Sequence, residues 1–156
     1  MVSAVVIVAM VVRWLDDDGR APAPLGLARS AAVAPFAGSE EVRAAVDDRC
    51  VRLVLADTPA LRTAGLRGAD DLGPYAGMLF VEDGDSRGAF TMSGVDRPLA
   101  ITWFASNGSR LDSARMAPCP DRSEADCPLY RSDRAYRYAL ETPGGDPASS
   151  IGPCVS

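Results

Sequence analysis

The sequence predicts a mainly β protein: a small β-sandwich or barrel-like domain with one or two short helices, preceded by an apolar N-terminal segment. Short apolar runs bounded by Gly, Pro, Asn and Asp recur from residue 51 onward, which is the pattern of strands joined by tight turns. Stretches with helical periodicity are few and brief. A chain of 156 residues is long enough for one such domain.

The N-terminal residues 1–15 are interpreted as a signal peptide or membrane anchor. Residues 2–12 form an apolar run, which suits the apolar region of a signal peptide but is shorter than the roughly 20 residues that span a bilayer. A buried core segment is the alternative. Residues 16–38 are acidic and then rich in Ala, Pro and Gly without periodicity, which predicts a flexible linker. Residues 39–156 are expected to form a single β domain.

Two short helices are expected early in this domain. Ser39 is placed to cap a helix over residues 39–47, whose first turn carries two glutamates. Thr58 and Pro59 are the residue types of an N-cap and a first helical position, so they predict a two-turn helix over residues 60–66. Two glycines are placed to end that helix, Gly65 and Gly68.

The remaining apolar runs predict strands. Residues 82–85 and 106–108 have the composition of connecting turns. The expected strands are residues 51–56, 78–81, 89–92, 100–105, 111–117, 135–141 and 151–155.

The four cysteines predict two disulfides, because their number is even and the N-terminus is typical of an exported protein. Cys119 and Cys127 bracket a short polar loop, so local closure is the simplest pairing. Cys50 and Cys154 then join the start of the first strand to the C-terminal region. A redox or metal site at Cys119 and Cys127 is the alternative, although their spacing is wider than that of a C-x-x-C motif. Disulfides place the protein outside the cytoplasm.

Composition excludes several kinds of chemistry. A net charge of −5 argues against non-specific nucleic-acid binding, because no excess of basic residues is available to neutralise phosphates. The chain has no histidine, which excludes Ser-His-Asp and Cys-His catalysis and histidine-ligated zinc. No cofactor or metal is expected, and acid–base chemistry would need a carboxyl group with a raised pKa. Carboxylates cluster at residues 70–71, 82–85 and 121–126, and solvated turns account for them.

A candidate ligand site lies on and beside two central strands. Thr91, Ser93 and Arg97 are the polar residues of a Gly-bearing segment between two apolar strands, where binding groups often lie. Trp103 and Tyr138 are strand aromatics that would offer a stacking surface for a sugar. Aromatic core packing and an ordinary surface turn are the alternatives.

A set of short motifs occurs in a fixed order over about two-thirds of the chain. They are Ala56-Asp-Thr58, Arg62, Gly65-Leu-Arg-Gly68, Gly77-Met-Leu-Phe80, Phe90-Thr-Met92, Pro98-Leu-Ala-Ile101, Pro118-Cys119, Cys127-Pro-Leu-Tyr130 and Tyr138-Ala-Leu-Glu141. In these motifs the chain, over about residues 51–156, resembles the domain of unknown function 192 family of small prokaryotic β domains. The resemblance implies a mainly β, sandwich-like fold and, by fold analogy alone, a carbohydrate-related binding role.

The chain departs from the family's pattern at four positions. Thr91 stands where the family usually has Trp or Tyr, and Ser93 and Gly94 stand where it usually has Lys and then Asn or Asp. Ala100 replaces a common Asp. If these positions form the family's ligand site, the site in this chain is altered or lost.

The sequence thus favours an exported or membrane-tethered binding module at the cell envelope, with sugar or polysaccharide as its expected ligand. The N-terminal segment would make the membrane contact. A small carboxylate-dependent hydrolase acting on glycans is the enzymatic alternative. A structural accessory partner of another envelope protein is the third.

Overall fold

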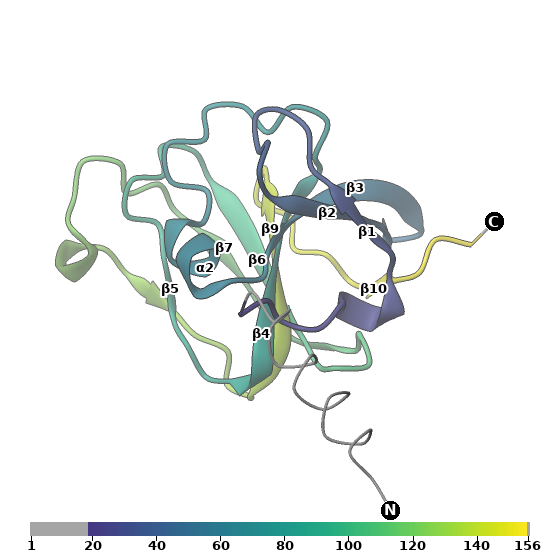
Figure 1. The fold of residues 1–156 in the computed structure, drawn as a ribbon. Helices are drawn as coiled ribbons and strands as arrows, with labels where there is room; N and C mark the ends of the chain where they lie inside the picture. The colour runs from purple at the N-terminus through teal and green to yellow at the C-terminus, as the bar shows by residue number, and fades with distance from the viewer. Residues whose placement is uncertain (1–18, 156) are drawn as a thin grey trace, which may run out of the picture.

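A curled, eight-stranded sheet carries the fold in the computed structural model, which describes residues 19–155 (Figure 1). Its strand order is β1-β2-β3-β4-β9-β6-β7, and β10 pairs with the outer edge of β2. All pairings in this sheet are antiparallel except that of β3 with β4. The strands are β1 (Arg29–Ala31), β2 (Glu40–Val46), β3 (Arg49–Ala56), β4 (Gly77–Ser86), β6 (Leu99–Phe104), β7 (Arg110–Met116), β9 (Tyr136–Pro143) and β10 (Ile151–Gly152). The predicted mainly β, barrel-like fold is confirmed.

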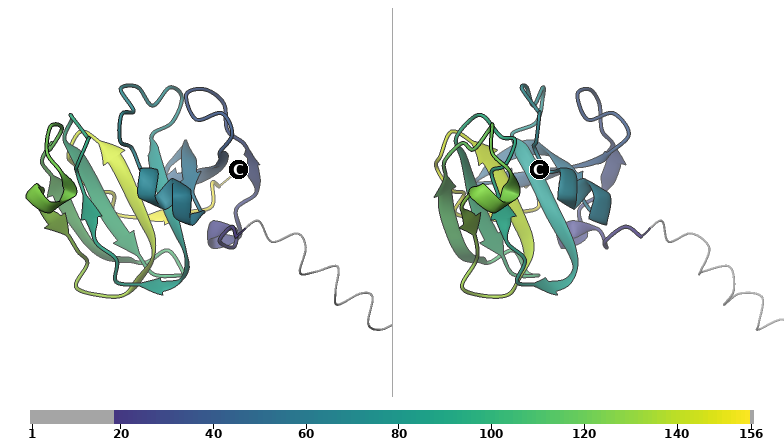
Figure 2. Two further views of the ribbon diagram at one scale, coloured as in Figure 1. Left: turned by 60° about the vertical axis from the view of Figure 1, so that its left-hand side comes forward. Right: turned by 90° about the vertical axis from the view of Figure 1, so that its left-hand side faces the viewer.

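The smaller elements lie around this sheet. A second sheet pairs β5 (Phe90–Thr91) with β8 (Leu129–Tyr130), and α2 (Pro59–Ala64) links β3 to β4 (Figure 2). Two 3-10 turns complete the described elements, η2 (Pro24–Gly26) and η3 (Glu124–Asp126).

The helix α2 has the predicted N-cap and first residue, and it ends at Ala64, before the first of the two predicted glycines. The Thr58 Oγ1 atom accepts a hydrogen bond from the Leu61 N–H at 3.2 Å, and Pro59 takes the first helical position. Gly65 ends the helix with a positive φ of 52°, which a side chain would strain. These local signals fix the two ends of α2.

The helix predicted over residues 39–47 is wrong: this segment is strand β2. Val42 and Ala44 are buried and Arg43 between them is exposed, which is the alternation of a strand. Asp47 and Asp48 both have positive φ and form a tight turn between β2 and β3. The two strands pair from Val46 and Arg49 beside this turn to Glu41 and Val54. Strand pairing therefore overrides the favourable position of the two glutamates for a helix start.

Residues 82–85, predicted as a turn, belong to β4, which continues to Ser86. The β4–β9 register shifts between Val81 and Ser86, so the strand is irregular there rather than ended. The turn at residues 106–108 and the other predicted strands are present, with ends displaced by a few residues and the last strand shortened to Ile151–Gly152.

Both faces of the sheet are covered. One face buries the apolar side chains of β3, β4, β6 and β9 under α2, the loop around Leu72 and Tyr75, and the β5–β8 pair. The other face buries Leu53, Leu79 and Phe104 under residues 20–32, here called the N-terminal arm, and under the segment that leads into β10. Strands β4, β9 and β6 are therefore central, with apolar residues on both sides.

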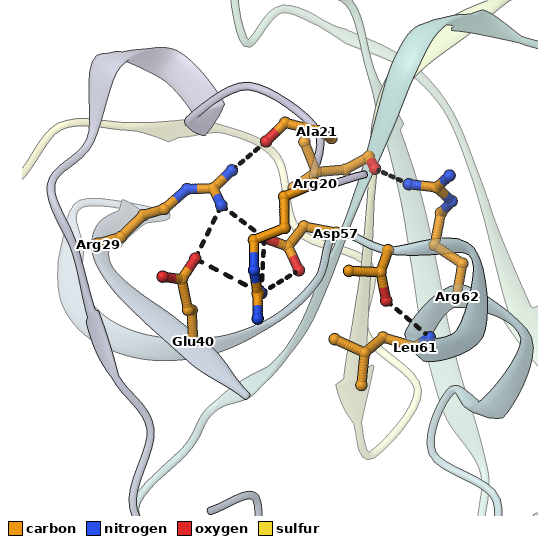
Figure 3. Close-up of polar contacts among 9 residues, drawn as sticks. Arg20, Ala21, Arg29, Glu40, Asp57, Leu61 and Arg62 are labelled. Carbon is orange, nitrogen blue, oxygen red and sulfur yellow. Dashed lines mark hydrogen bonds and ion pairs between the residues drawn. The ribbon is translucent and has the colours of Figure 1, made fainter. Parts of the chain in front are cut away.

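The flexible linker predicted over residues 16–38 differs from the structure in its described part. Ala21 and Leu27 are buried, and β1 pairs with β2. The carboxylate of Asp57, which is fully buried, pairs with Arg20 at 3.2 Å and Arg29 at 2.6 Å (Figure 3). These contacts make the arm part of the domain, because they replace the water lost by a buried charge.

The predicted signal peptide or anchor at residues 1–15 lies outside the described residues. Between residues 19 and 155, no helix has the length and apolar character needed to cross a membrane.

Two disulfides join Cys50 to Cys154 and Cys119 to Cys127, the pairing expected from the sequence. The first encloses a long loop, with a sequence separation of 104, and the second a short one, with a separation of 8. They indicate an oxidising, extracytoplasmic setting.

Candidate functional site

A cleft of about 460 Å³ lies between α2 and the segment 88–95 that contains β5. Its floor is formed by side chains of β4 and β9, Phe80, Glu82, Tyr136 and Glu141. The volume is within the range of pockets that hold small molecules, about 300–1,000 Å³. The cleft therefore brings three separate parts of the chain to one site.

Glu141 is the unusual residue of this floor. Its side chain is on the central strand β9, the residue is only 4% exposed, and it lies between Met78 of β4 and Ile101 of β6. Burial alone raises the pKa of its carboxyl to about 8, and in the described chain no hydrogen bond or ion pair opposes this effect. At neutral pH this group is mostly protonated, and it can give or take a proton near physiological pH.

The β4 strand is held unusually close to this residue. A Cβ atom on Gly77 would lie 2.2 Å from the Glu141 carbonyl oxygen, so only glycine fits there. Gly77 thus allows the close pairing of β4 and β9 that sets the position of the Glu141 side chain.

A second carboxyl group, that of Glu82, lies on the same strand floor. Burial raises the pKa of Glu82, and the nearby charge of Arg62 opposes this shift, with Nε 3.6 Å from Oε2. The Arg62 guanidinium has two further contacts: it donates to the Val81 carbonyl at 2.7 Å and to Asp83 at 3.2 Å. Arg62 thereby fixes α2 to β4 beside the cleft.

Aromatic rings of β4, β5 and β9 also line the cleft. Phe90 stacks edge-on against Phe80, with ring centroids 5.0 Å apart, and lies 6.1 Å from the Tyr136 ring. The Tyr136 hydroxyl donates to the Gly88 carbonyl at 3.2 Å, and burial raises the pKa of this hydroxyl. This aromatic part of the cleft is therefore apolar, and the Tyr136 hydroxyl within it is already bonded.

One end of the cleft is closed by Arg67. Its Nε donates to the Ser93 carbonyl at 2.9 Å, and its Nη2 pairs with Glu124 of η3. Because Glu124 lies in the loop that the Cys119–Cys127 disulfide closes, that disulfide helps to hold the wall of the cleft.

Of the five residues predicted to bind a ligand, only Thr91 lines this cleft. The Ser93 hydroxyl donates to the Arg122 carbonyl at 2.9 Å, and Arg97 donates to the Ala69 carbonyl, so both side chains have structural contacts. The structure does not bring the five together around one ligand-sized space.

The predicted stacking surface is absent from the described fold because both rings are inside it. Trp103 is 1% exposed and belongs to the core under α2 and β5. Tyr138 is 7% exposed, belongs to the core on the opposite face, and accepts a hydrogen bond from the Leu25 N–H at 3.3 Å. Core packing, the stated alternative, accounts for both.

Glu141 and Glu82 are the residues that sequence reasoning missed. The sequence predicts a strand over residues 135–141 but gives no sign that both of its faces are covered. In the structure the run from Tyr138 to Glu141 is buried on both faces. A carboxylate that ends such a run is the signal that was available in the sequence.

Comparisons with known proteins identify the fold. The model of a family termed domain of unknown function 192 (DUF192), described as "Uncharacterized ACR", matches residues 42–150. No match is found among curated proteins.

Two solved structures are similar to the chain. One is a protein of unknown function from Novosphingobium aromaticivorans, with a TM-score of 0.62 and 22% identity over 81% of this chain and 94% of that one. The other is a putative transcription regulator from Sinorhizobium meliloti, with a TM-score of 0.55 and 21% identity over 78% of this chain and 85% of that one. At these identities the likeness shows the fold alone.

Proposed function

We propose that this chain, which belongs to the DUF192 family, is an extracytoplasmic binding module and that its ligand site is the cleft between α2 and β5. The module would act at the cell envelope, secreted or tethered through its N-terminal segment. Carbohydrate is the proposed class of ligand. The catalytic alternative is a small hydrolase that uses the carboxyls of the same cleft.

The observation that carries this proposal is the buried carboxyl of Glu141 in the floor of the cleft. Taking a polar group out of water costs free energy unless a hydrogen bond replaces the water, and no described residue bonds this carboxyl. Leucine at this position would fill the same space without that cost. A ligand that hydrogen-bonds the carboxyl would offset the cost of burying it.

The lining of the cleft supports a carbohydrate. Sugars present hydroxyl groups together with apolar C–H faces, and the cleft offers carboxyl groups beside the aromatic rings of Phe80, Phe90 and Tyr136. The cleft replaces the exposed stacking surface that Trp103 and Tyr138 were expected to form.

The two disulfides support export, and the apolar residues 2–12 supply a segment that would direct it. Fractionation of cells that produce the full-length protein tests this part of the proposal. Recovery with membranes or in the extracytoplasmic fraction, without free thiols, is expected. A reduced pool in the cytoplasm would contradict it.

Binding itself is tested with the oxidised full-length protein in a sedimentation assay with peptidoglycan and cell-wall polysaccharides. Saturable binding is expected, and Ala64→Trp should abolish it because Ala64 is exposed and lines the cleft. The matched control is Ala60→Trp, an exposed position of the same helix that does not line the cleft. Equal binding by both variants would rule out this cleft as the site.

The hydrolase alternative is favoured by one observation, namely that two carboxyl groups with raised pKa values lie in the same cleft. The same assay distinguishes it when the release of reducing ends is followed. Hydrolysis that Glu141→Gln abolishes while binding survives would establish the enzyme. Binding without hydrolysis would support the binding module instead of the enzyme.

A further inference from the structure

Hydrogen-bond donors and acceptors are unequally available in the cleft. Its charged donors are in use: Arg62 bonds the Val81 carbonyl and Asp83, and Arg67 bonds the Ser93 carbonyl and Glu124. The Tyr136 hydroxyl donates to the Gly88 carbonyl. A ligand that needs strong donors from the protein would find these already engaged.

Acceptors, by contrast, remain free. Both carboxyl oxygens of Glu141 lack a partner among the described residues. Glu82 has an ion pair with Arg62 at 3.6 Å, which is longer than a hydrogen bond, so its oxygens also retain bonding capacity. When Glu141 is ionised, the floor of the cleft therefore offers free acceptors, while its charged donors are engaged.

We propose that the ligand presents an ammonium group to Glu141, so that the cleft binds amino sugars or other organic amines. This inference rests on the proposed ligand site and names the class of ligand within it. An ammonium group offers three donors and no acceptor, which matches the free acceptors of the floor. It also supplies the positive charge that an ionised Glu141 needs in a buried position.

The aromatic wall favours the same class. Phe80, Phe90 and Tyr136 line the same cleft as Glu141, and ring faces attract organic cations. A hydroxyl ligand would gain less from these rings, since it carries no net charge.

Binding of the cation is coupled to the loss of a proton. The free protein holds a proton on the Glu141 carboxyl, and that proton passes to the solvent when the ammonium group takes its place. No covalent bond to the ligand forms or breaks.

The other titratable and charged groups around the floor come from each packed element. They are Arg62 of α2, Glu82 of β4, Tyr136 of β9, Arg67 of the turn that follows α2, and Glu124 of η3. The two arginines are paired within the protein, so they do not replace the ligand as the partner of Glu141.

The pH dependence has a definite sign. Since the Glu141 pKa is about 8 in the free protein, the ionised form that binds the cation becomes more populated as the pH rises toward 8. Affinity for an amine should therefore increase up to about tenfold per pH unit below the pKa. Affinity for a neutral sugar should not follow this rise.

The test is calorimetric titration of the oxidised full-length protein in detergent with glucosamine, N-acetylglucosamine, glucose and choline. Choline keeps its charge at every pH, so it isolates the ionisation of the protein. Glucosamine should bind at least tenfold more tightly than glucose or N-acetylglucosamine at pH 7, with release of a proton. Glu141→Gln should remove this preference and the pH dependence, and Ala64→Trp should remove binding.

The outcomes separate this inference from the proposed function. Equal binding of glucose and glucosamine without pH dependence would overturn the ammonium inference and leave the cleft as a sugar site. Binding of choline alone, whose nitrogen has no N–H group, would overturn the hydrogen-bonded ammonium group and leave a site that recognises only the charge of a quaternary amine. If none of the four probes binds, both the ammonium inference and the proposed carbohydrate site are overturned. If Glu141→Gln keeps the preference for glucosamine and its pH dependence, the ammonium inference is overturned.

Discussion

At the scale of single residues, Glu141 and Asp57 show two opposite solutions to a buried carboxyl. Asp57 is fully buried, and two arginines bond it within the protein. Glu141 is buried almost as deeply, yet it has no such partner among the described residues. The first arrangement stabilises the fold, whereas the second keeps a reactive group available to the cleft.

The raised pKa of Glu141 predicts that the protein loses stability as the pH rises. In the folded state the carboxyl keeps its proton up to a pKa of about 8, against an ordinary value of 4.5. Between these values the folded state binds more protons than the unfolded state, so the free energy of unfolding falls with pH by at most about 1.4 kcal/mol per unit. Urea unfolding of wild type and Glu141→Gln at pH 5, 6.5 and 8 measures this effect.

The Gln variant should show a shallower dependence on pH and should exceed wild type in stability at pH 8. The comparison cancels the contributions of other titrating groups, such as Glu82 and Glu41, because both proteins contain them. Parallel pH dependences in the two proteins would mean that Glu141 is hydrated or paired in solution.

At the scale of elements, the close approach of β4 and β9 depends on one residue. Gly77→Ala would place a methyl group against the Glu141 carbonyl, and the backbone must move to accept it. We expect a loss of about 1–3 kcal/mol in the free energy of unfolding, together with weaker ligand binding. Gly84→Ala is the matched control in the same strand, since a Cβ there meets no atom within 4 Å. Denaturant unfolding of both variants decides the point, and equal losses would contradict it.

The N-terminal arm provides a second prediction at this scale. Asp57→Asn removes the charge that holds Arg20 and Arg29, and we expect it to cost about 3 kcal/mol, the low end for a broken buried pair. Hydrogen exchange of residues 20–32 should rise at the same time. Glu40→Gln, at a more exposed position of the same cluster, should cost under about 1 kcal/mol. An arm that stays protected in Asp57→Asn would show that apolar packing alone holds it.

Elements were predictable from sequence where their signals are local. Thr58, Pro59 and Gly65 specify the start and end of α2 within seven residues, and the structure places each of them as expected. Strand β2 is different, because its two glutamates also suit a helix start and its strand form depends on pairing with β3. Such pairing is a non-local choice that propensity does not reveal.

The sequence predicted a segment that borders the candidate site, but it did not predict the residues on the floor of the site. The segment 91–97 borders the cleft through Thr91, yet Ser93 and Arg97 bond backbone carbonyls instead. Glu141 belongs to the site because β9 lies at the centre of the sheet with both faces covered. No alternation pattern in a single strand indicates that position.

At the scale of the whole molecule, the disulfides should contribute unequally to stability. In the loop-entropy model, closing a loop of about 100 residues contributes about 4–5 kcal/mol, and a loop under about 15 residues contributes about 3 kcal/mol or less. The double variant Cys50→Ala with Cys154→Ala should therefore unfold at lower denaturant than Cys119→Ala with Cys127→Ala. Equilibrium unfolding of the two oxidised variants measures the order, and the reverse order would show that the short loop supports more of the native packing.

The construction of the cleft has a consequence for how such domains diversify. The floor residues lie on strands whose pairing forms the fold, whereas the opposing walls come from α2 and from the segment around β5. Substitutions in the walls can resize the opening without disturbing the strand register beneath it. Descendants of one ancestral domain can therefore exchange specificities while inheriting the same scaffold, and low identity between such proteins is compatible with a shared architecture.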